Sequence, residues 1–231
     1  EVGDLKPGTT YYYQLENGDN KSGVYHFTTG GSGDFSFAFV GDPQIGASGN
    51  VGSDTTGWGK TLDLIKTDDR FSDVSFLLSA GDQVDTHNNE NQYDGYLDHD
   101  VLTGLPSATV IGNHDSASDT YSKHFSVANE SSQYGKTNAG GDSYFVYNKT
   151  LFLILNSNNL STAEHRQFML DSISAVEDQD IQWKIVVFHH SVYSVASHAV
   201  DKDILSRRDA LVPVFKELDI DAVLMGHDHV Y

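Results

Sequence analysis

The sequence predicts an α/β fold with a largely parallel sheet, and three observations support that class. Short apolar runs alternate with stretches whose apolar residues have the helical period. Glycine and then a polar residue follow most of these runs, as happens where an open parallel sheet binds its ligand. The first 30 residues differ, because they have the turn chemistry of a β-hairpin. The six strands predicted after the hairpin are Phe35–Val40, Val74–Leu78, Ala108–Ile111, Leu151–Leu155, Ile185–Phe188 and Ala222–Met225.

The hairpin is predicted from its turn residues. Pro7-Gly8 precedes a run rich in threonine and tyrosine, and Asn17-Gly18-Asp19-Asn20 separates that run from a second one. A lone hairpin is marginally stable in water, so we expect residues 1–30 to close the sheet of a larger all-β domain. Gly30-Gly31-Ser32-Gly33 then has the composition of a flexible linker. The main domain is therefore predicted to span residues 34–231.

Two later segments, Ser161–Val176 and Ser206–Leu218, are predicted to be amphipathic helices. The first begins with Ser161 and Glu164, which have the spacing of a capping box. His165 stands beside charged residues and is expected on the solvent-exposed face of this helix. The apolar face of the first helix comprises Phe168, Met169, Ile173 and Val176.

The composition excludes several classes of function. The chain has 33 acidic and 14 basic residues, and a surface with a formal net charge of −19 repels nucleic-acid backbones. It can still bind an anion locally, where metal cations reverse the field. The absence of cysteine excludes disulfides and thiolate metal sites. No apolar run approaches the roughly 18 residues that a membrane-spanning helix needs.

The residues after the predicted strands carry the chemistry. At four of five strand ends a glycine comes first, which allows a tight turn and the close backbone approach that a Cβ would block. In a parallel sheet these ends lie on one edge. Carboxylates, an amide and imidazoles that converge there form a ligand set for divalent metal ions. The residues concerned are Asp42, Asp82, Asp85, Asn113, His114, His189, His190, His227 and His229.

In order, the motifs Gly-Asp-x-x, Gly-Asp-x-x-Asp, Gly-Asn-His-Asp, a single His and Gly-His-x-His resemble those of the calcineurin-like metallophosphoesterases. The N-terminal hairpin and the stretch from His189 to His198 resemble the purple acid phosphatase branch. This resemblance implies a two-sheet α/β sandwich with two metal ions at the strand ends. It also implies that residues 1–30 end a fibronectin type III-like domain, that the intact protein continues beyond residue 231, and that it is secreted or attached to the cell surface.

The resemblance also assigns ligands. The single histidine is identified as His189 rather than His190, because only His189 stands four residues before an aromatic residue and nine before another histidine. Adjacent residues at a strand end point to opposite sides, so His190 is expected to face away or to line the rim of the pocket. The implied ligands are Asp42 and His229 for the first ion, Asn113, His189 and His227 for the second, and Asp82 as the bridge between them.

Two positions depart from the purple acid phosphatases. Their first metal, an iron ion, is bound by a tyrosinate at the position of Asp85. Asp85 instead resembles a carboxylate of the protein Ser/Thr phosphatases that orients the histidine equivalent to His114; the alternative is a helix N-cap. Other branches have a histidine at the position of Gln44, which either lends an amide oxygen to the first metal or merely turns the chain. The two ions are therefore expected to be iron, zinc or manganese.

The implied activity is the hydrolysis of a small phosphomonoester by a hydroxide that bridges the two metal ions. His114 and His198 match histidines of the family that are not ligands. One of them is expected to stabilise charge on the phosphoryl group or to protonate the leaving oxygen. Two alternatives stay open: a phosphodiesterase or nucleotidase, which only the loops at 46–60 and 86–100 would distinguish, and a non-catalytic cell-surface adhesion module. The sequence does not specify an oligomeric state.

Overall fold

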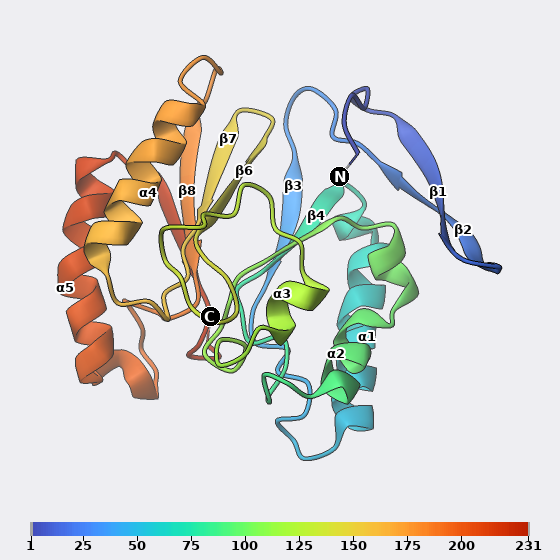
Figure 1. Cartoon of the computed structure of the whole chain (residues 1–231), viewed down its shortest axis with the longest axis horizontal. Helices are drawn as coiled ribbons and strands as arrows, with labels where there is room; N and C mark the ends of the chain where they lie inside the picture. The colour runs from blue at the N-terminus through green and yellow to red at the C-terminus, as the bar shows by residue number, and fades with distance from the viewer. Residues whose placement is uncertain (1, 231) are drawn as a thin grey trace.

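The computed structural model describes residues 2–230, which form a two-sheet α/β sandwich and a projecting hairpin (Figure 1). One sheet has three parallel strands in the order β3-β4-β5, and the other has four strands in the order β6-β7-β8-β9. The predicted fold class is confirmed. The strands are β3 (Ser36–Val40), β4 (Val74–Ser79), β5 (Ser107–Thr109), β6 (Ser143–Tyr147), β7 (Thr150–Ile154), β8 (Trp183–Phe188) and β9 (Ala222–Met225).

A shared apolar core holds the two sheets face to face. Successive residues of a strand point to opposite faces, so Phe76 and Leu78 of β4 face the other sheet while Leu77 faces the helices. The ring of Phe76 meets that of Phe152 on β7 edge to face, with 5.7 Å between the centroids. Apolar side chains from both sheets thus form one interdigitated layer.

Helices cover the outer faces of the sandwich (Figure 1). Trp58 and Leu62 of α1 pack against the three-stranded sheet, and Phe168 of α4 and Phe215 of α5 pack against the four-stranded one. Within residues 2–230 no helix is both long and apolar enough to cross a membrane. The α-helices are α1 (Val51–Thr67), α2 (Glu90–Leu97), α3 (Thr120–His124), α4 (Thr162–Ala175) and α5 (Lys202–Glu217), and the 3₁₀ helices are η1 (Asp69–Phe71), η2 (Asp100–Thr103) and η3 (Ser197–Val200).

The six predicted strands all exist, but the prediction of their arrangement was incomplete. Strands β3 to β5 are parallel to one another, and so are β7 to β9. Strand β6, which was not predicted, pairs with β7 in the antiparallel direction. The third strand was predicted at Ala108–Ile111, but β5 spans Ser107–Thr109 in the structure. Val110 and Ile111 therefore belong to the loop that enters the site.

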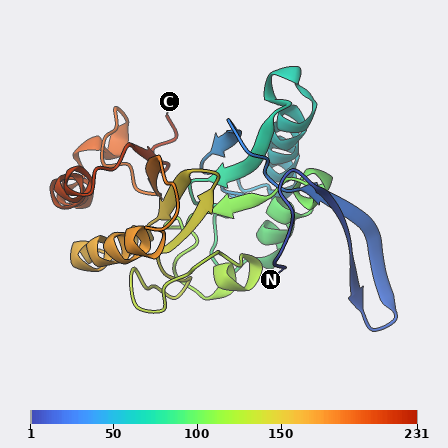
Figure 2. The ribbon, with the colours of Figure 1, turned by 90° about the horizontal axis from the view of Figure 1, so that it is seen from above.

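The N-terminal hairpin consists of β1 (Thr10–Asn17) and β2 (Asn20–Thr28), and it projects from the body of the molecule (Figure 2). The Tyr13 hydroxyl of β1 donates a hydrogen bond to the Thr103 carbonyl oxygen at 2.8 Å and so links the hairpin to the main domain. No third strand pairs with it among residues 2–230. The hairpin is confirmed, and its membership of a fibronectin-like domain stays a prediction.

The expectation that His165 is solvent-exposed is wrong. Its side chain is only 2% exposed, and its Nδ1 lies 2.7 Å from the carboxylate of Asp142. Its Nε2 lies 2.9 Å from the carbonyl oxygen of Asn159. Asp142 is 23 residues away in sequence, so only the folded chain brings the pair together.

The predicted capping box of α4 is half present. The Ser161 hydroxyl accepts the backbone N–H of Glu164 at 3.3 Å, as a helix N-cap should. The carboxylate of Glu164 does not return to Ser161 but accepts the N–H of Gly135 at 3.0 Å. The start of α4 is therefore tied to the loop before β6 instead of being closed on itself.

The buried pair of His165 and Asp142 predicts a pH-dependent stability. Burial lowers the pKa of His165, but the hydrogen bond and charge of Asp142 outweigh burial and raise it above its usual value. The stability that such a group contributes is complete below its unfolded pKa, about 6.5, and is lost as the pH rises through the folded pKa. His165→Gln should lower the free energy of unfolding by about 3–5 kcal/mol at pH ~6 and by less at pH ~9. Denaturant unfolding of both proteins in a chelator measures this, and a loss that is equal at every pH would contradict a charged pair.

Candidate metal centre

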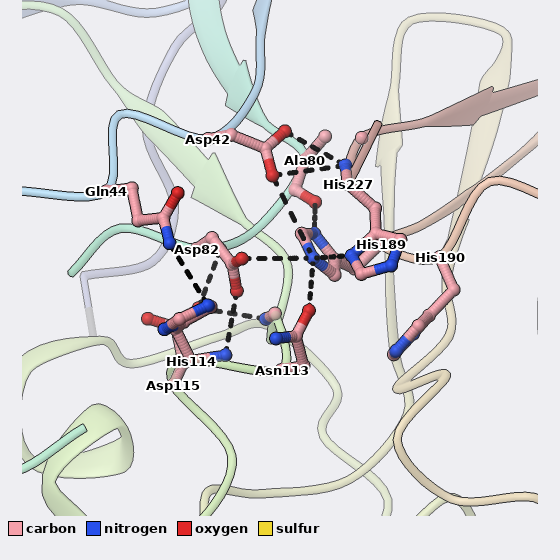
Figure 3. A network of polar contacts seen from close by, with 12 residues as sticks. Asp42, Gln44, Ala80, Asp82, Asn113, His114, Asp115, His189, His190 and His227 are labelled. Atoms are coloured by element: carbon pink, nitrogen blue, oxygen red, sulfur yellow. Dashed lines mark hydrogen bonds and ion pairs between the residues drawn. The ribbon is translucent and has the colours of Figure 1, made fainter. Parts of the chain in front are cut away.

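The strand-end residues of both sheets converge at one edge of the sandwich (Figure 3). The three-stranded sheet supplies two carboxylates, an amide and the imidazole of His114, and the four-stranded sheet supplies the other imidazoles. The site therefore exists only when the two sheets are packed together. In chain order, Asp42 follows β3, Asp82 follows β4, Asn113 and His114 follow β5, His189 and His190 follow β8, and His227 and His229 follow β9.

The backbone at this edge is strained. Four of the proposed ligands, none of them glycine, have positive φ angles in the left-handed region, a conformation that is unfavourable by about 1–3 kcal/mol per residue. Such strain persists only where the surrounding structure enforces it, and it concentrates at functional sites. These residues are Asp42 (54°), Asp82 (53°), His227 (75°) and His229 (52°).

Glycines let the ligand-bearing turns approach each other. A Cβ on Gly112 would lie 2.0 Å from a carboxylate oxygen of Asp82, far inside contact distance. A Cβ on Gly81, whose φ is +104°, would lie 2.6 Å from Nδ1 of His189. Glycine is thus required at both positions by the space that the ligand side chains occupy.

His189 lies at the centre of the cluster and is fully buried. Its Nδ1–H donates to the carbonyl oxygen of Ala80 at 2.8 Å, which leaves Nε2 to face the site. That nitrogen lies 2.9 Å from Oδ1 of Asn113, 3.3 Å from the carboxylate of Asp82 and 3.2 Å from Nδ1 of His227. Burial lowers the pKa of His189, but Asp82 and Asp42 outweigh burial and raise it, so the cluster favours a positive charge at this point.

Asp42 joins the turns that carry the two histidines of the last motif. Both of its carboxylate oxygens accept the backbone N–H of His227, at 3.1 and 3.0 Å, and one oxygen lies 3.4 Å from Nε2 of His229. Burial and the neighbouring imidazoles lower the pKa of His227 to about 4. Its ring is therefore neutral near pH 7 and has a lone pair to offer.

Asp82 is buried and is held by the loop after β5, because one of its oxygens accepts the backbone N–H of His114 at 2.9 Å. Beneath it, a single oxygen of Asp115 accepts the N–H groups of Asp82 and Gly112, both at 2.8 Å. Burial, together with the charge of Asp82, raises the pKa of Asp115 to about 7. The sequence did not predict a role for Asp115, although it is the last residue of the Gly-Asn-His-Asp motif.

Asp85 lies beside His114, but the shortest contact is made by its backbone. The Nδ1–H of His114 donates to the carbonyl oxygen of Asp85 at 2.7 Å, whereas a carboxylate oxygen of Asp85 lies 3.6 Å away. The amide nitrogen of Gln44 lies 3.0 Å from Nε2 of His114 and 3.4 Å from the Asp85 carboxylate, so Gln44 is turned toward this pair. The N-cap alternative for Asp85 is excluded, because α2 begins after Asn89.

His190 points away from the carboxylates of the cluster (Figure 3). Its Nδ1 accepts a hydrogen bond from the Ser157 hydroxyl at 2.8 Å, and its backbone N–H donates to the same hydroxyl oxygen at 3.2 Å. Burial, followed by the charge of Arg207, lowers the pKa of His190 to about 2, so its ring is neutral. Nothing in the sequence pointed to Ser157, which follows β7.

His198 reaches the cluster from the 3₁₀ helix η3. Its ring centroid lies 4.6 Å from that of His227, and its Nδ1–H donates to the Asp201 carboxylate at 2.8 Å. This hydrogen bond raises the pKa of His198. A raised pKa favours the protonated form of this partly exposed imidazole, which suits it to donate a proton. Asp201 was missed because its only signal is its position three residues after His198.

The arrangement fits metal ions. Ligand atoms of Asp82, His189 and His227 lie within 4.8 Å of one another, and so do those of His198, His227 and Asp228. Carboxylate and amide oxygens together with imidazole nitrogens are ligands that zinc, iron and manganese accept. All six predicted ligand positions lie in or next to this cluster, whereas the Nδ1 of His190 faces Ser157.

The chain is similar to plant purple acid phosphatases along its whole length. It is 25% identical over 246 residues to "Purple acid phosphatase 21" and 24% identical over 244 residues to "Probable purple acid phosphatase 20", both of Arabidopsis thaliana. Each alignment covers 100% of this chain, but 52% and 53% of the respective relative. The chain thus spans about half the length of the relatives that it matches.

A solved structure and a family profile also match this chain. The solved structure of the purple acid phosphatase PPD1 from yellow lupin (Lupinus luteus) seeds matches 98% of this chain with a TM-score of 0.68, at 18% identity and over 45% of that chain. The two molecules therefore share a fold. The family profile of the calcineurin-like phosphoesterases matches residues 35–231. This match covers the whole sandwich and the metal-binding edge, and the chain belongs to the calcineurin-like phosphoesterase family.

Proposed function

We propose that this chain hydrolyses phosphate monoesters with a dinuclear metal centre, as an acid-phosphatase-like enzyme. The observation that carries the proposal is that possible ligand atoms converge on the Nε2 of His189. This nitrogen lies within 3.3 Å of atoms of Asn113, Asp82 and His227, which follow three other strands. The proposed ligands are Asp42 and His229 for one ion, Asn113, His189 and His227 for the other, and Asp82 between them.

The chain's own residues have distinct tasks in this proposal. Two metal ions would polarise the phosphoryl group and activate a water molecule for attack on phosphorus. As an imidazolium, His114 would donate its Nε2–H to the phosphoryl oxygens, because its Nδ1–H is donated to the backbone carbonyl oxygen of Asp85. His198 would protonate the leaving oxygen. Because the chain has a formal net charge of −19, the metal ions would supply the local attraction for an anionic substrate, so a small phosphorylated substrate is favoured over nucleic acid.

Metal analysis combined with a substrate panel tests this proposal. The purified chain, loaded with Zn²⁺, Mn²⁺ or Fe²⁺, should bind about two ions and hydrolyse 4-nitrophenyl phosphate faster than bis(4-nitrophenyl) phosphate. Faster hydrolysis of the diester or of nucleotides would favour a diesterase or nucleotidase. A chain that binds metal ions without hydrolysing any ester would support an adhesion module, and a chain that binds none would overturn the metal centre.

The identity of the first metal can be tested by colour. A visible charge-transfer band of ferric iron needs a phenolate ligand, and the position of the tyrosinate in purple acid phosphatases is Asp85 here. Tyr93 is buried, with its hydroxyl turned to the carbonyl oxygen of His87 at 3.3 Å, and Tyr193 is exposed. We therefore predict no intense visible band after iron loading in air, as recorded by absorption spectroscopy. A band that persists in Asp85→Ala would show that another tyrosine binds the iron.

The proposal extends to the surroundings of the site. The projecting hairpin supports the assignment of residues 1–30 to a separate all-β domain of the fibronectin type III kind, with residues 34–231 as the catalytic domain. A secreted or cell-surface location rests on the resemblance to fibronectin-linked members of the family. Limited proteolysis at residues 30–33 tests the boundary, because a linker between domains should be cut first.

A further inference from the structure

Asp228 is a buried carboxylate without a partner. Its side chain is 8% exposed, and neither of its carboxylate oxygens forms a hydrogen bond within residues 2–230. Among the other side chains of residues 2–230 that have a buried polar atom without a partner, each has only one such atom. Burying a carboxylate is unfavourable unless a donor or a cation compensates it, so Asp228 requires a partner close by.

Two imidazoles lie near this carboxylate without contacting it. Ligand atoms of Asp228, His227 and His198 lie within 4.8 Å of one another. The Nδ1 of His227 faces His189, and the Nδ1 of His198 is bonded to Asp201. The Nε2 of each ring forms no hydrogen bond with the residues described. The Asp228 carboxylate and two imidazoles, each with a nitrogen that forms no hydrogen bond, thus lie near one another, and a side-chain rotation would join them.

We propose that Asp228 is a positioning residue, whose carboxylate accepts the Nε2–H of His227 and thereby presents the Nδ1 of that ring to a metal ion. This inference rests on the proposed metal centre. Histidine ligands almost always donate their other N–H to a carboxylate, carbonyl or water, which fixes the tautomer and makes the ligating nitrogen more basic. The second oxygen of Asp228 is left for His198, so one carboxylate links a metal ligand to the proposed acid.

This role has a signature that a purely structural residue would not give. An unpartnered buried carboxylate contributes nothing to folding, so its removal should leave the metal-free chain as stable as before or more stable. Metal affinity should move in the opposite direction, because loss of the partner of a histidine ligand weakens metal binding by about 10–100-fold. A structural residue would lose stability and affinity together.

The experiment compares Asp228→Ala and Asp228→Asn with the unaltered chain. Zn²⁺ affinity and stoichiometry are measured by competition with a chromophoric chelator, and unfolding is measured in EDTA. Asp209→Asn is the matched control, because Asp209 is exposed on α5 and its side chain forms no hydrogen bond or ion pair within residues 2–230. We expect one zinc site weakened about 10–100-fold in Asp228→Ala, a smaller loss in Asp228→Asn, which keeps an acceptor oxygen, and no loss of stability in either.

Three results would overturn the inference. Unchanged zinc affinity would show that His227 does not need Asp228, and a parallel loss of stability would make Asp228 structural. A third zinc equivalent in the unaltered chain, lost in both variants while two sites keep their affinity, would make Asp228 a direct ligand of a separate site. If the unaltered chain binds no zinc, the proposed metal centre itself fails, and that failure is visible before any variant is compared.

Discussion

His189→Ala should remove about one of the two metal equivalents and with it nearly all turnover, whereas His190→Ala should keep both ions. The reason is geometric. The Nε2 of His189 lies 2.9 Å from Asn113 and 3.3 Å from Asp82, inside the cluster, whereas the Nδ1 of His190 is engaged by Ser157 outside it. Elemental analysis of both variants after identical metal loading and desalting measures the difference, and 4-nitrophenyl phosphate reports the turnover.

The two variants control for each other, because each removes one buried imidazole from the same strand end. His190→Ala also removes the acceptor of the Ser157 hydroxyl proton, although the hydroxyl oxygen still accepts the backbone N–H of residue 190, so a loss of stability in that variant is expected and is separate from metal binding. Unfolding in a chelator distinguishes the two effects. Loss of an ion from His190→Ala alone would show that the two histidines had been assigned the wrong way round.

The sequence could mark candidate ligands because each stands in a local pattern. Gly81-Asp82 and Gly226-His227 follow apolar runs directly, and strands that end in this way bring their polar residues to one edge. The choice of His189 over His190 needed the spacing to Tyr193 and His198, which is a resemblance and not a physical rule. In the folded chain the Nε2 of His189 faces Asn113 and the Nδ1 of His190 faces Ser157, and the choice between them as metal ligand stays a prediction.

Features that depend on distant residues could not be predicted. His165 sits among charged neighbours in sequence, and only folding brings Asp142 to it. Helix α1 contains three glycines, which weaken its helical signal, so it was not predicted from its pattern. Strand β6 pairs with β7 and is joined to it by a two-residue turn at Asn148, whose positive φ suits a hairpin. Because this turn is short and lies between apolar residues, it did not separate the two strands in the sequence pattern.

His198→Ala should keep both metal ions and lower turnover by about 10²-fold or more on substrates with a poor leaving group. An alkyl phosphate needs its leaving oxygen protonated in the transition state, whereas 4-nitrophenolate leaves without much help, so the loss should be much smaller for 4-nitrophenyl phosphate. The control is His26→Ala, which removes an exposed imidazole on the distant hairpin and should change neither rate.

The hydrogen bond from His198 to Asp201 gives this prediction a pH dependence. The Asp201 carboxylate raises the pKa of His198, so the protonated acid persists to higher pH than that of an isolated histidine. Asp201→Asn should lower that pKa, and the rate on an alkyl phosphate should then begin to fall at a lower pH, while the low-pH rate stays near that of the unaltered chain. Rates for both proteins are measured with saturating metal across pH 5–9. If the high-pH fall of the rate profile does not move in Asp201→Asn, another group donates the proton. If the rate on an alkyl phosphate is unchanged in His198→Ala, His198 has no part in the reaction.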